Sequence, residues 1–239
     1  MKNSKKFRNL LSVSSDFKTK KGEKLGFLTG ILYLMPTKKL CPFASIAGCS
    51  EACLVSAGRG AFNSVKNARI NKGELFENDQ EYFMLSLIHD IKALERKAKR
   101  EKLTPLVRLN GTSDINYLKI KINGKTIFEH FPHIQFYDYT KNCLTAIKNT
   151  YSNYDITFSY SALPAYDKYV KIAIKSGVRM AVVFRDKNKI PSTFLGLNVV
   201  NGDNSDVRHL DNQGVIVALY AKGKAKKDDS GFVVDGVLA

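Results

Sequence analysis

Long apolar runs are missing from this sequence. No stretch approaches the roughly twenty apolar residues that a helix needs to cross a bilayer, so we expect no membrane span. The N-terminus is basic, but no long apolar core and no small-residue cleavage site follow it, which argues against a secretory signal. A cytoplasmic protein is therefore expected.

Several familiar nucleotide-binding and catalytic motifs are also missing. The chain has no G-x-G-x-x-G fingerprint and no serine in a nucleophile elbow. Asn123-Gly124-Lys125-Thr126 resembles a phosphate-binding loop, but Lys119 stands where that loop requires a glycine. We interpret the stretch as the turn of a β-hairpin between residues 119–122 and 126–128.

Acidic residues are scarce relative to basic ones. The 239 residues include 38 Lys and Arg against 22 Asp and Glu, a formal net charge of +16. Such a field attracts polyanions, chiefly nucleic acid, because bound phosphates release counterions. Nucleic acid is therefore the expected partner, with a surface that serves solubility as the alternative. Residues 1–24 are predicted to form a basic arm or a first short element.

Cysteine is rare and unevenly used. The chain has four cysteines, which in this pattern do not indicate a disulfide framework and favour reduced thiols available for metal. Cys41, Cys49 and Cys53 lie close together in the spacing C-x7-C-x3-C. That spacing lacks the paired C-x2-C units of a zinc ribbon.

Residues 40–60, which we call the cysteine loop, are therefore the first candidate site. Thiolates bind soft or borderline metals, and a flexible loop can bring three of them together. Three cysteines would leave one iron of a [4Fe–4S] cluster open to another ligand. A closed zinc site would need a fourth ligand, for which Cys143 is the candidate. Three small buried cysteines without metal are the alternative.

The remaining pattern predicts an α/β fold with a single domain over residues 25–239. An apolar run at 26–35 predicts a buried strand that enters the cysteine loop. A short helix is expected at 63–72, and Asn78 with Glu81 resembles a capping box for a long amphipathic helix over 79–102. Further strands are predicted at 106–109, 134–139, 156–160, 180–184 and 215–219, with a helix at 166–176. This alternation favours a largely parallel sheet, open or closed into a complete or partial TIM-like barrel.

Ionisable groups follow several of these strands. Because chemistry in such folds collects at the carboxyl ends of the strands, one mouth is expected to gather them with the cysteines. The expected set is Cys41, Cys49, Cys53, Asp114, Asp138, Tyr139, Lys141 and Arg185. Within it, the predicted catalytic residues are Asp114, Asp138, Tyr139 and Lys141, which would position substrate or transfer protons. The predicted cofactor-binding turn is Asn110, Gly111, Thr112 and Ser113, where glycine permits a close backbone approach.

A second interpretation concerns HFPHIQFYDYTK, residues 130–141. Rolling-circle replication nucleases pair a metal-binding histidine motif with Tyr-x-x-x-Lys, and Tyr137 with Lys141 resembles the second part. Their histidine motif is His-hydrophobic-His, whereas Phe-Pro separates His130 from His133 here. The alternative hypothesis is a nuclease with Tyr137 or Tyr139 as nucleophile, and whether the two histidines bind metal is left open.

The chain also resembles an uncharacterised family of bacteriophage proteins. The matching pieces are CPFAS…GC…CL…AGRG (41–60), VRLNGTSDI (107–115), QFYDYTK (135–141) and GVIVALYAKGKAKKDDSGF (214–232). These pieces span most of the chain. The resemblance implies a phage-encoded protein of the host cytoplasm, and some family members carry replication-initiation labels.

More distantly, a cysteine loop after the first strand and a glycine-containing turn after the second resemble the radical S-adenosylmethionine architecture. This resemblance implies that Cys41, Cys49 and Cys53 hold a [4Fe–4S] cluster whose open iron binds the cofactor's amino and carboxyl groups. The turn at 111–114 would approach that amino group. The usual spacing is C-x3-C-x2-C with an aromatic residue before the last cysteine, where this chain has Ala52.

Three functional hypotheses therefore stand. The first is an iron–sulfur protein acting on or beside nucleic acid, of radical S-adenosylmethionine type if it is an enzyme. The second is the rolling-circle nuclease. The third is a non-catalytic nucleic-acid-binding protein with a structural metal, zinc being the alternative to iron.

Overall fold

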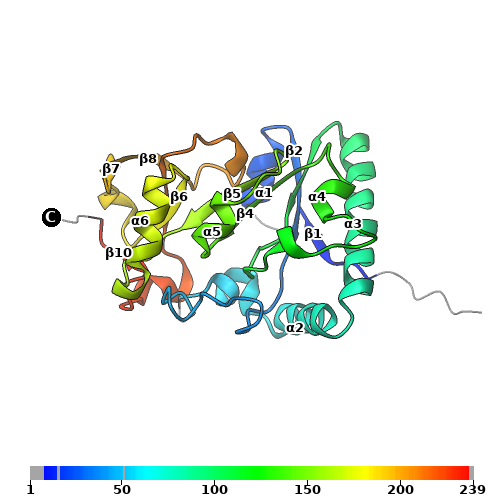
Figure 1. Ribbon diagram of the computed structural model, residues 1–239, viewed down its shortest axis with the longest axis horizontal. Coiled ribbons are helices and arrows are strands. Elements are labelled where there is room, and N and C mark those ends of the chain that lie inside the picture. The colour runs from blue at the N-terminus through cyan, green and yellow to red at the C-terminus, as the bar shows by residue number, and fades with distance from the viewer. Residues whose placement is uncertain (1–7, 15–16, 51, 237–239) are drawn as a thin grey trace, which may run out of the picture.

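A computed structural model describes residues 8–14, 17–50 and 52–236. Its centre is a ten-stranded sheet in the order β1-β2-β3-β4-β5-β6-β9-β8-β7, with β10 paired to β6 (Figure 1). The strands are β1 (Leu11–Val13), β2 (Phe27–Leu32), β3 (Thr104–Arg108), β4 (Gln135–Thr140), β5 (Tyr154–Ser159), β6 (Met180–Phe184), β7 (Thr193–Phe194), β8 (Leu197–Asn201), β9 (Ile216–Tyr220) and β10 (Val233–Val234).

Helices occupy most of the connections between the strands. The α-helices are α1 (Phe17–Glu23), α2 (Asn63–Asn78), α3 (Gln80–Glu101), α4 (Ile127–His130), α5 (Cys143–Ile147) and α6 (Asp167–Lys175). The 3-10 helices are η1 (Leu54–Ser56), η2 (Gly58–Ala61), η3 (Tyr117–Lys119), η4 (Pro164–Tyr166), η5 (Lys187–Lys189), η6 (Arg208–Leu210) and η7 (Gly223–Lys227). None of the helices in the described ranges is both long enough and apolar enough to cross a membrane.

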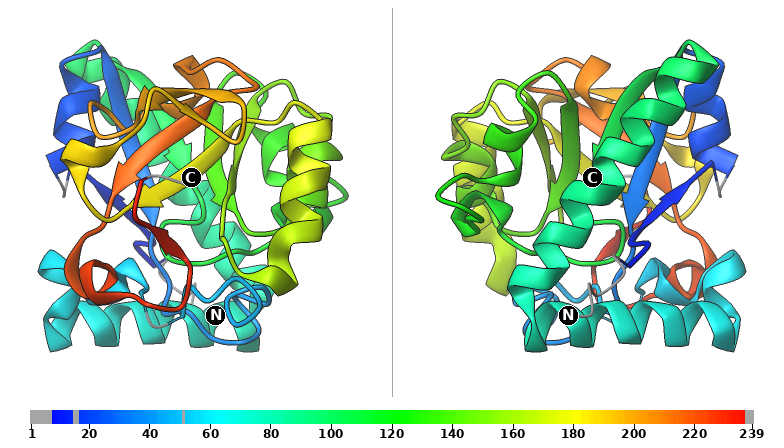
Figure 2. Two further views of the ribbon diagram at one scale, coloured as in Figure 1. Left: turned by 90° about the vertical axis from the view of Figure 1, so that its left-hand side faces the viewer. Right: turned by 90° about the vertical axis from the view of Figure 1, so that its right-hand side faces the viewer.

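The sheet is largely parallel, as predicted. Strands β2, β3, β4, β5, β6 and β9 are neighbours in this order and all run parallel. Antiparallel pairs stand at both edges, β1 with β2 and β7 with β8. Within the described residues the two edge strands do not pair with each other, so the curved sheet is not closed into a complete TIM-like barrel (Figure 2). The short antiparallel edge strands end the parallel run on either side.

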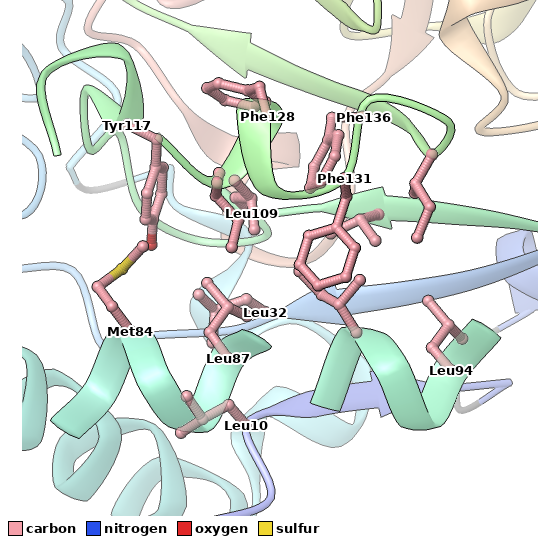
Figure 3. Packing of buried hydrophobic residues seen from close by; sticks show 14 of the residues in the cluster. Leu10, Leu32, Met84, Leu87, Leu94, Leu109, Tyr117, Phe128, Phe131 and Phe136 are labelled. Atoms are coloured by element: carbon pink, nitrogen blue, oxygen red, sulfur yellow. The ribbon is translucent and has the colours of Figure 1, made fainter. Parts of the chain in front are cut away.

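Helix α3 builds the larger hydrophobic core, and it matches the helix predicted over 79–102. Its apolar side chains recur at helical spacing and pack against β2, β3 and the segments before β4. Figure 3 shows Leu87 of α3 beside Leu32 and Leu94 farther along the same helix, with Phe131 and Phe136 across from the helix. The helix is capped by Asp79, whose side chain accepts the Tyr82 N–H at 3.1 Å, one residue later than the predicted cap.

The hairpin predicted around residues 123–124 is only partly present. Ile122 and Lys125 form an isolated antiparallel bridge, but the residues after it enter α4 instead of a strand. Thr126 and Glu129 form a complete capping box for this helix. The capping box gives hydrogen-bond acceptors to the backbone N–H groups at the start of α4. A short strand without a neighbouring strand would leave these groups bonded only to water, so the helix is favoured.

Buried Asp90 attaches the N-terminal strand to α3. Its carboxylate accepts the backbone N–H groups of Leu10 at 2.5 Å and Leu11 at 2.9 Å. Part of the predicted basic arm, residues 1–7 and 15–16, lies outside the described residues. The remainder includes β1, which this carboxylate holds against the core.

Asp138 joins three strands on the helix-covered face of the sheet. Its carboxylate accepts the Asn110 N–H at 2.7 Å and the Tyr154 hydroxyl at 3.0 Å. The side chain is 1% exposed, and burial raises its pKa to about 7, against the hydrogen bonds that favour ionisation. Asp138 therefore stabilises the fold by linking β4 to the end of β3 and the start of β5. It lies on the opposite face of β4 from Tyr137 and Tyr139, because successive side chains of a strand alternate between faces.

The opposite side of the sheet is filled by the connection between β8 and β9. Val207 packs there against Phe27, Leu106 and Tyr137. Asp206 accepts hydrogen bonds from Arg108 at 2.8 Å and from the Tyr137 hydroxyl at 3.2 Å. These contacts fill the concave face of the sheet.

Replacing Asp90 tests the attachment of β1. Asp90→Ala should lower the free energy of unfolding by about 1–3 kcal/mol, because two backbone N–H groups lose a charged acceptor. Urea denaturation followed by circular dichroism measures the loss. Glu81→Ala on the same helix is the control and should change stability by about 0.5 kcal/mol or less, since Glu81 is exposed. Equal losses in the two variants would contradict the anchoring role.

Asp138 should give stability a characteristic dependence on pH. An aspartate in the unfolded chain ionises near pH 4, whereas folded Asp138 has a pKa of about 7. Between these values the folded state binds the extra proton, so its contribution to stability falls as pH rises from about 4 to 7. Urea unfolding at pH 5 and pH 8 should therefore show wild type losing stability relative to Asp138→Asn, on the order of 1.4 kcal/mol per pKa unit. Parallel pH profiles for the two proteins would refute this.

Candidate functional site

The cysteine loop leaves β2 and joins the carboxyl edge of the sheet at the end of β3. The backbone N–H of Asp114 donates to Leu40 O at 2.7 Å, and the Thr112 hydroxyl donates to Leu34 O at 2.6 Å. Within the loop, Gly48 has φ +65°, and a Cβ there would lie 2.8 Å from a Leu163 methyl group. Only glycine fits this turn, which brings the loop against the segment after β5.

The three thiols of the loop interact with one another electrostatically. Burial raises the pKa of Cys41 to about 12, and Asp114, Cys53 and Cys49 add to the rise. Burial also raises the pKa of Cys49 and of Cys53. Thiols in this state carry protons at neutral pH, so a metal that bound them would displace those protons.

Two cations face these thiols from different elements. Buried Lys141, just after β4, lowers the pKa of Cys49 against the effect of burial, and Arg69 on α2 does so at Cys53. The Lys141 ammonium group donates to Tyr160 O at 2.9 Å and Ser159 O at 3.2 Å. Burial lowers the pKa of Lys141 to about 8, although Cys49 and Asp114 favour its charge.

In this conformation the three thiols do not form a complete metal site. In residues 8–14, 17–50 and 52–236, no group of three or more His, Cys, Asp or Glu side chains is arranged to hold a metal ion. The composition nevertheless suits a soft metal, because three thiols from one loop share an edge with two cations. Coordination would require the loop to draw the thiols together, and metal binding is commonly coupled to folding in this way.

The predicted cofactor-binding turn is stabilised by hydrogen bonds of its own. Asn110 accepts the Ser113 hydroxyl and the Ile115 N–H, both at 2.9 Å, through one side-chain oxygen. A Cβ on Gly111 would lie 2.6 Å from the Tyr33 ring, so this position accepts no larger residue without movement. The Cys41 thiol lies 3.9 Å from Thr112 O. The turn is thus preformed and its backbone directly borders the cysteine loop.

Two of the four predicted catalytic residues stand at this edge. Asp114 accepts the Thr140 hydroxyl at 2.7 Å and the Lys141 N–H at 2.9 Å, which links the ends of β3 and β4. Burial raises the pKa of Asp114, while these hydrogen bonds and the Lys141 charge oppose the rise. Asp114 and Lys141 therefore form a linked pair beside Cys41 and Cys49.

Asp138, Tyr139 and Arg185 make their contacts with groups other than the thiols. Asp138 faces the helix-covered side of the sheet. Tyr139 lies on the concave side with the Arg108 guanidinium 4.7 Å from its ring centre, and burial raises its pKa. Arg185 binds the C-terminal segment through Lys226 O at 3.0 Å, Asp228 O at 2.7 Å and the Asp235 carboxylate.

The residues of the nuclease hypothesis are dispersed. Tyr137 is fully buried, and its hydroxyl donates to Asp206. His130 contacts Ile122 O at 3.0 Å, and His133 contacts the Glu95 carboxylate at 2.8 Å. Both histidines precede β4, whereas Tyr137 lies within it.

Sequence reasoning missed Arg69 and the contact that Phe232 of the C-terminal segment makes with Lys141. Arg69 is 9% exposed, donates to Val55 O at 3.0 Å and lies 4.9 Å from the centre of the Tyr33 ring. Arg69, Gly73 and Phe76 are buried at spacings of four and three residues, so Arg69 lies on the inward face of α2, and this spacing is visible in the sequence. Phe232 covers the Lys141 ammonium group at 4.1 Å, a contact between distant segments that no local pattern indicates.

A small pocket adjoins the cysteine loop. Its volume is about 150 Å³. Pro42 and Phe43 line it from the loop, and Asn110, Asp114 and Asn142 line it from the strand ends. It is smaller than the roughly 300–1,000 Å³ usual for whole small-molecule ligands, so as it stands it admits only part of one.

Comparison with known proteins identifies the family. The family model described as Gene product 88 matches residues 3–236. A search of curated proteins finds no match, and neither does a search of solved structures. Since the family model covers nearly the whole chain, this protein belongs to the Gene product 88 family, a family of the bacteriophage type that the sequence pieces indicated.

Proposed function

We propose that this protein is an iron–sulfur protein whose cysteine loop holds the cluster, and that it acts on or beside nucleic acid. The observation that carries the proposal is the grouping of Cys41, Cys49 and Cys53 at one edge of the sheet with Lys141. A cation beside thiolates favours their charged form and offsets the negative charge of a thiolate-bound cluster.

The order of elements supports the finer proposal of a radical S-adenosylmethionine type of site. The cysteine loop follows the first of six consecutive parallel strands, and the turn at 110–114 follows the second. When bound, a three-cysteine cluster supplies an open iron for the amino and carboxyl groups of S-adenosylmethionine and a source of single electrons. The preformed turn would present its backbone to that cofactor, and Lys141 would place a positive charge beside the site.

A structural zinc site is the second candidate. Cys143 begins α5 and is fully buried in the apolar cluster against which Cys49 also packs. A fourth thiol in that neighbourhood would complete a closed tetrahedral set. This alternative gives a nucleic-acid-binding protein without redox chemistry.

The rolling-circle nuclease receives less support. Tyr137 is buried, and its hydroxyl donates a hydrogen bond to Asp206. His130 contacts the Ile122 carbonyl oxygen and His133 contacts the Glu95 carboxylate. Tyr139 is the more accessible of the two tyrosines, because it is half-buried whereas Tyr137 is fully buried.

Metal analysis of cysteine variants decides between these alternatives. Anaerobically purified wild type should be brown and contain about four irons per chain. Cys41→Ala, Cys49→Ala and Cys53→Ala should each lose most of the iron and the visible absorption, because a three-cysteine cluster has no spare ligand. Iron analysis and visible spectra check this.

Cys143→Ala is the matched control, since it removes a thiol outside the loop. Full iron content in this variant supports the cluster. One zinc, no colour and loss of zinc in Cys143→Ala would replace the cluster with the zinc site. Absence of both metals after reconstitution would overturn metal binding, and a covalent DNA adduct that disappears on Tyr139→Phe would establish the nuclease.

A further inference from the structure

A basic and apolar surface is formed by the C-terminal end of the cysteine loop, the residue Phe62 that follows it shortly, and the segment η7. We call it the η2–η7 face, and its residues are Leu54, Arg59, Phe62, Lys224, Lys226 and Lys227. The two segments that carry it are in contact: a Cβ on Gly223 would lie 3.3 Å from Ala57 Cβ. Ala52, Ala221 and Ala225 pack together beneath them. Figure 2 shows the C-terminal segment beside the segment that follows the cysteines.

Positive charge is concentrated on this face. Arg59, Lys224, Lys226 and Lys227 are exposed, and within the described part of the chain they make no ion pair. Neighbouring Lys222 differs, because it pairs with Asp203 at 2.9 Å. Asp228 is buried and accepts the Val233 N–H at 3.0 Å, and only the next residue, Asp229, places an exposed carboxylate directly after the lysines.

The local fold of η7 explains why its lysines point outward. Ala225 is 2% exposed and packs in the small alanine-rich cluster, so the turn has one inward position. Lys224 and Lys226 flank this residue, and Lys227 follows, all three exposed. A short turn anchored by one small side chain thus displays three cations on a fixed backbone.

Exposed apolar side chains stand on the segment that η7 contacts, which runs from η1 through η2. Phe62 is 61% exposed and Leu54 is 53% exposed, among the largest values for big apolar residues in the described part of the chain. Phe62 follows η2 and lies three residues after Arg59. An accessible aromatic ring and a row of cations on two segments in contact form a combination on which unpaired bases can stack while their phosphates are neutralised.

We propose that the η2–η7 face binds single-stranded nucleic acid, with its lysines and Arg59 contacting phosphates and Phe62 stacking on a base. Single strands expose base faces, whereas a duplex keeps them stacked inside. The inference rests on the nucleic-acid part of the proposed function and is independent of which metal the cysteine loop holds. Because η1 directly follows Cys53, a bound strand would run past the last of the three cysteines.

Anisotropy titrations with a labelled 20-nucleotide oligothymidine, over a salt series, test the face. Lys224→Gln/Lys226→Gln/Lys227→Gln should reduce the magnitude of the salt slope by about 0.7 for each phosphate that is no longer neutralised, hence by about 2. Phe62→Ala should weaken binding by about tenfold with an unchanged salt slope, because stacking releases no counterions. Wild type should bind a duplex of the same length more weakly.

The matched control is Lys92→Gln/Arg96→Gln/Lys99→Gln, which removes three exposed charges from α3. If this control weakens binding as much as the η7 variant, net charge rather than the face is responsible and the proposal is overturned. If wild type binds the duplex more tightly than the single strand, and Phe62→Ala does not change this binding, the partner is a duplex and the single-strand proposal is overturned. Failure of wild type to bind any nucleic acid would remove the nucleic-acid function itself, whereas wild-type binding that all variants retain would remove only this face. Circular dichroism and metal content, measured on the same samples, establish that each variant is folded.

Discussion

One backbone hydrogen bond, from Asp114 N–H to Leu40 O, joins the cysteine loop to the turn after β3. The Asp114 carboxylate then accepts from the end of β4, and the Lys141 ammonium group donates to carbonyls at the end of β5. Four successive connections at the carboxyl edge are thus linked by hydrogen bonds. The candidate site depends on this chain of hydrogen bonds, because it is what holds the loop over the sheet.

The electrostatics of the edge follow from burial. Partly buried thiols and the Asp114 carboxyl group have raised pKa values, and buried Lys141 has a lowered one, so each group is shifted toward its neutral form. The attraction between Lys141 and the acidic groups opposes these shifts. A cluster of soft donors with adjustable charge is suited to a cationic ligand, which is the physical basis of the metal proposal.

Much of the fold could be predicted from local pattern, while part of the candidate site could not. Helix α3 and the parallel strands follow from apolar periodicity, which tertiary packing reinforced. Asp138 shows where placement by strand end alone fails: successive side chains alternate between faces, so Asp138 and Tyr139 point to opposite sides. The Asn123-Gly124 signal favoured a hairpin, but the capping residues Thr126 and Glu129 favour a helix.

The order of amino acids was enough to establish the α/β class, the positions of the main strands and the clustering of three cysteines after the first parallel strand. The family assignment also depends on residues alone. Three features could be learned only from the folded chain. The sheet stays open, and of the residues expected at one mouth Asp114 and Lys141 lie beside the thiols whereas Asp138 and Tyr139 do not. The third feature is the contact between η7 and η1. They depend on contacts between residues far apart in sequence, and no local periodicity encodes such contacts.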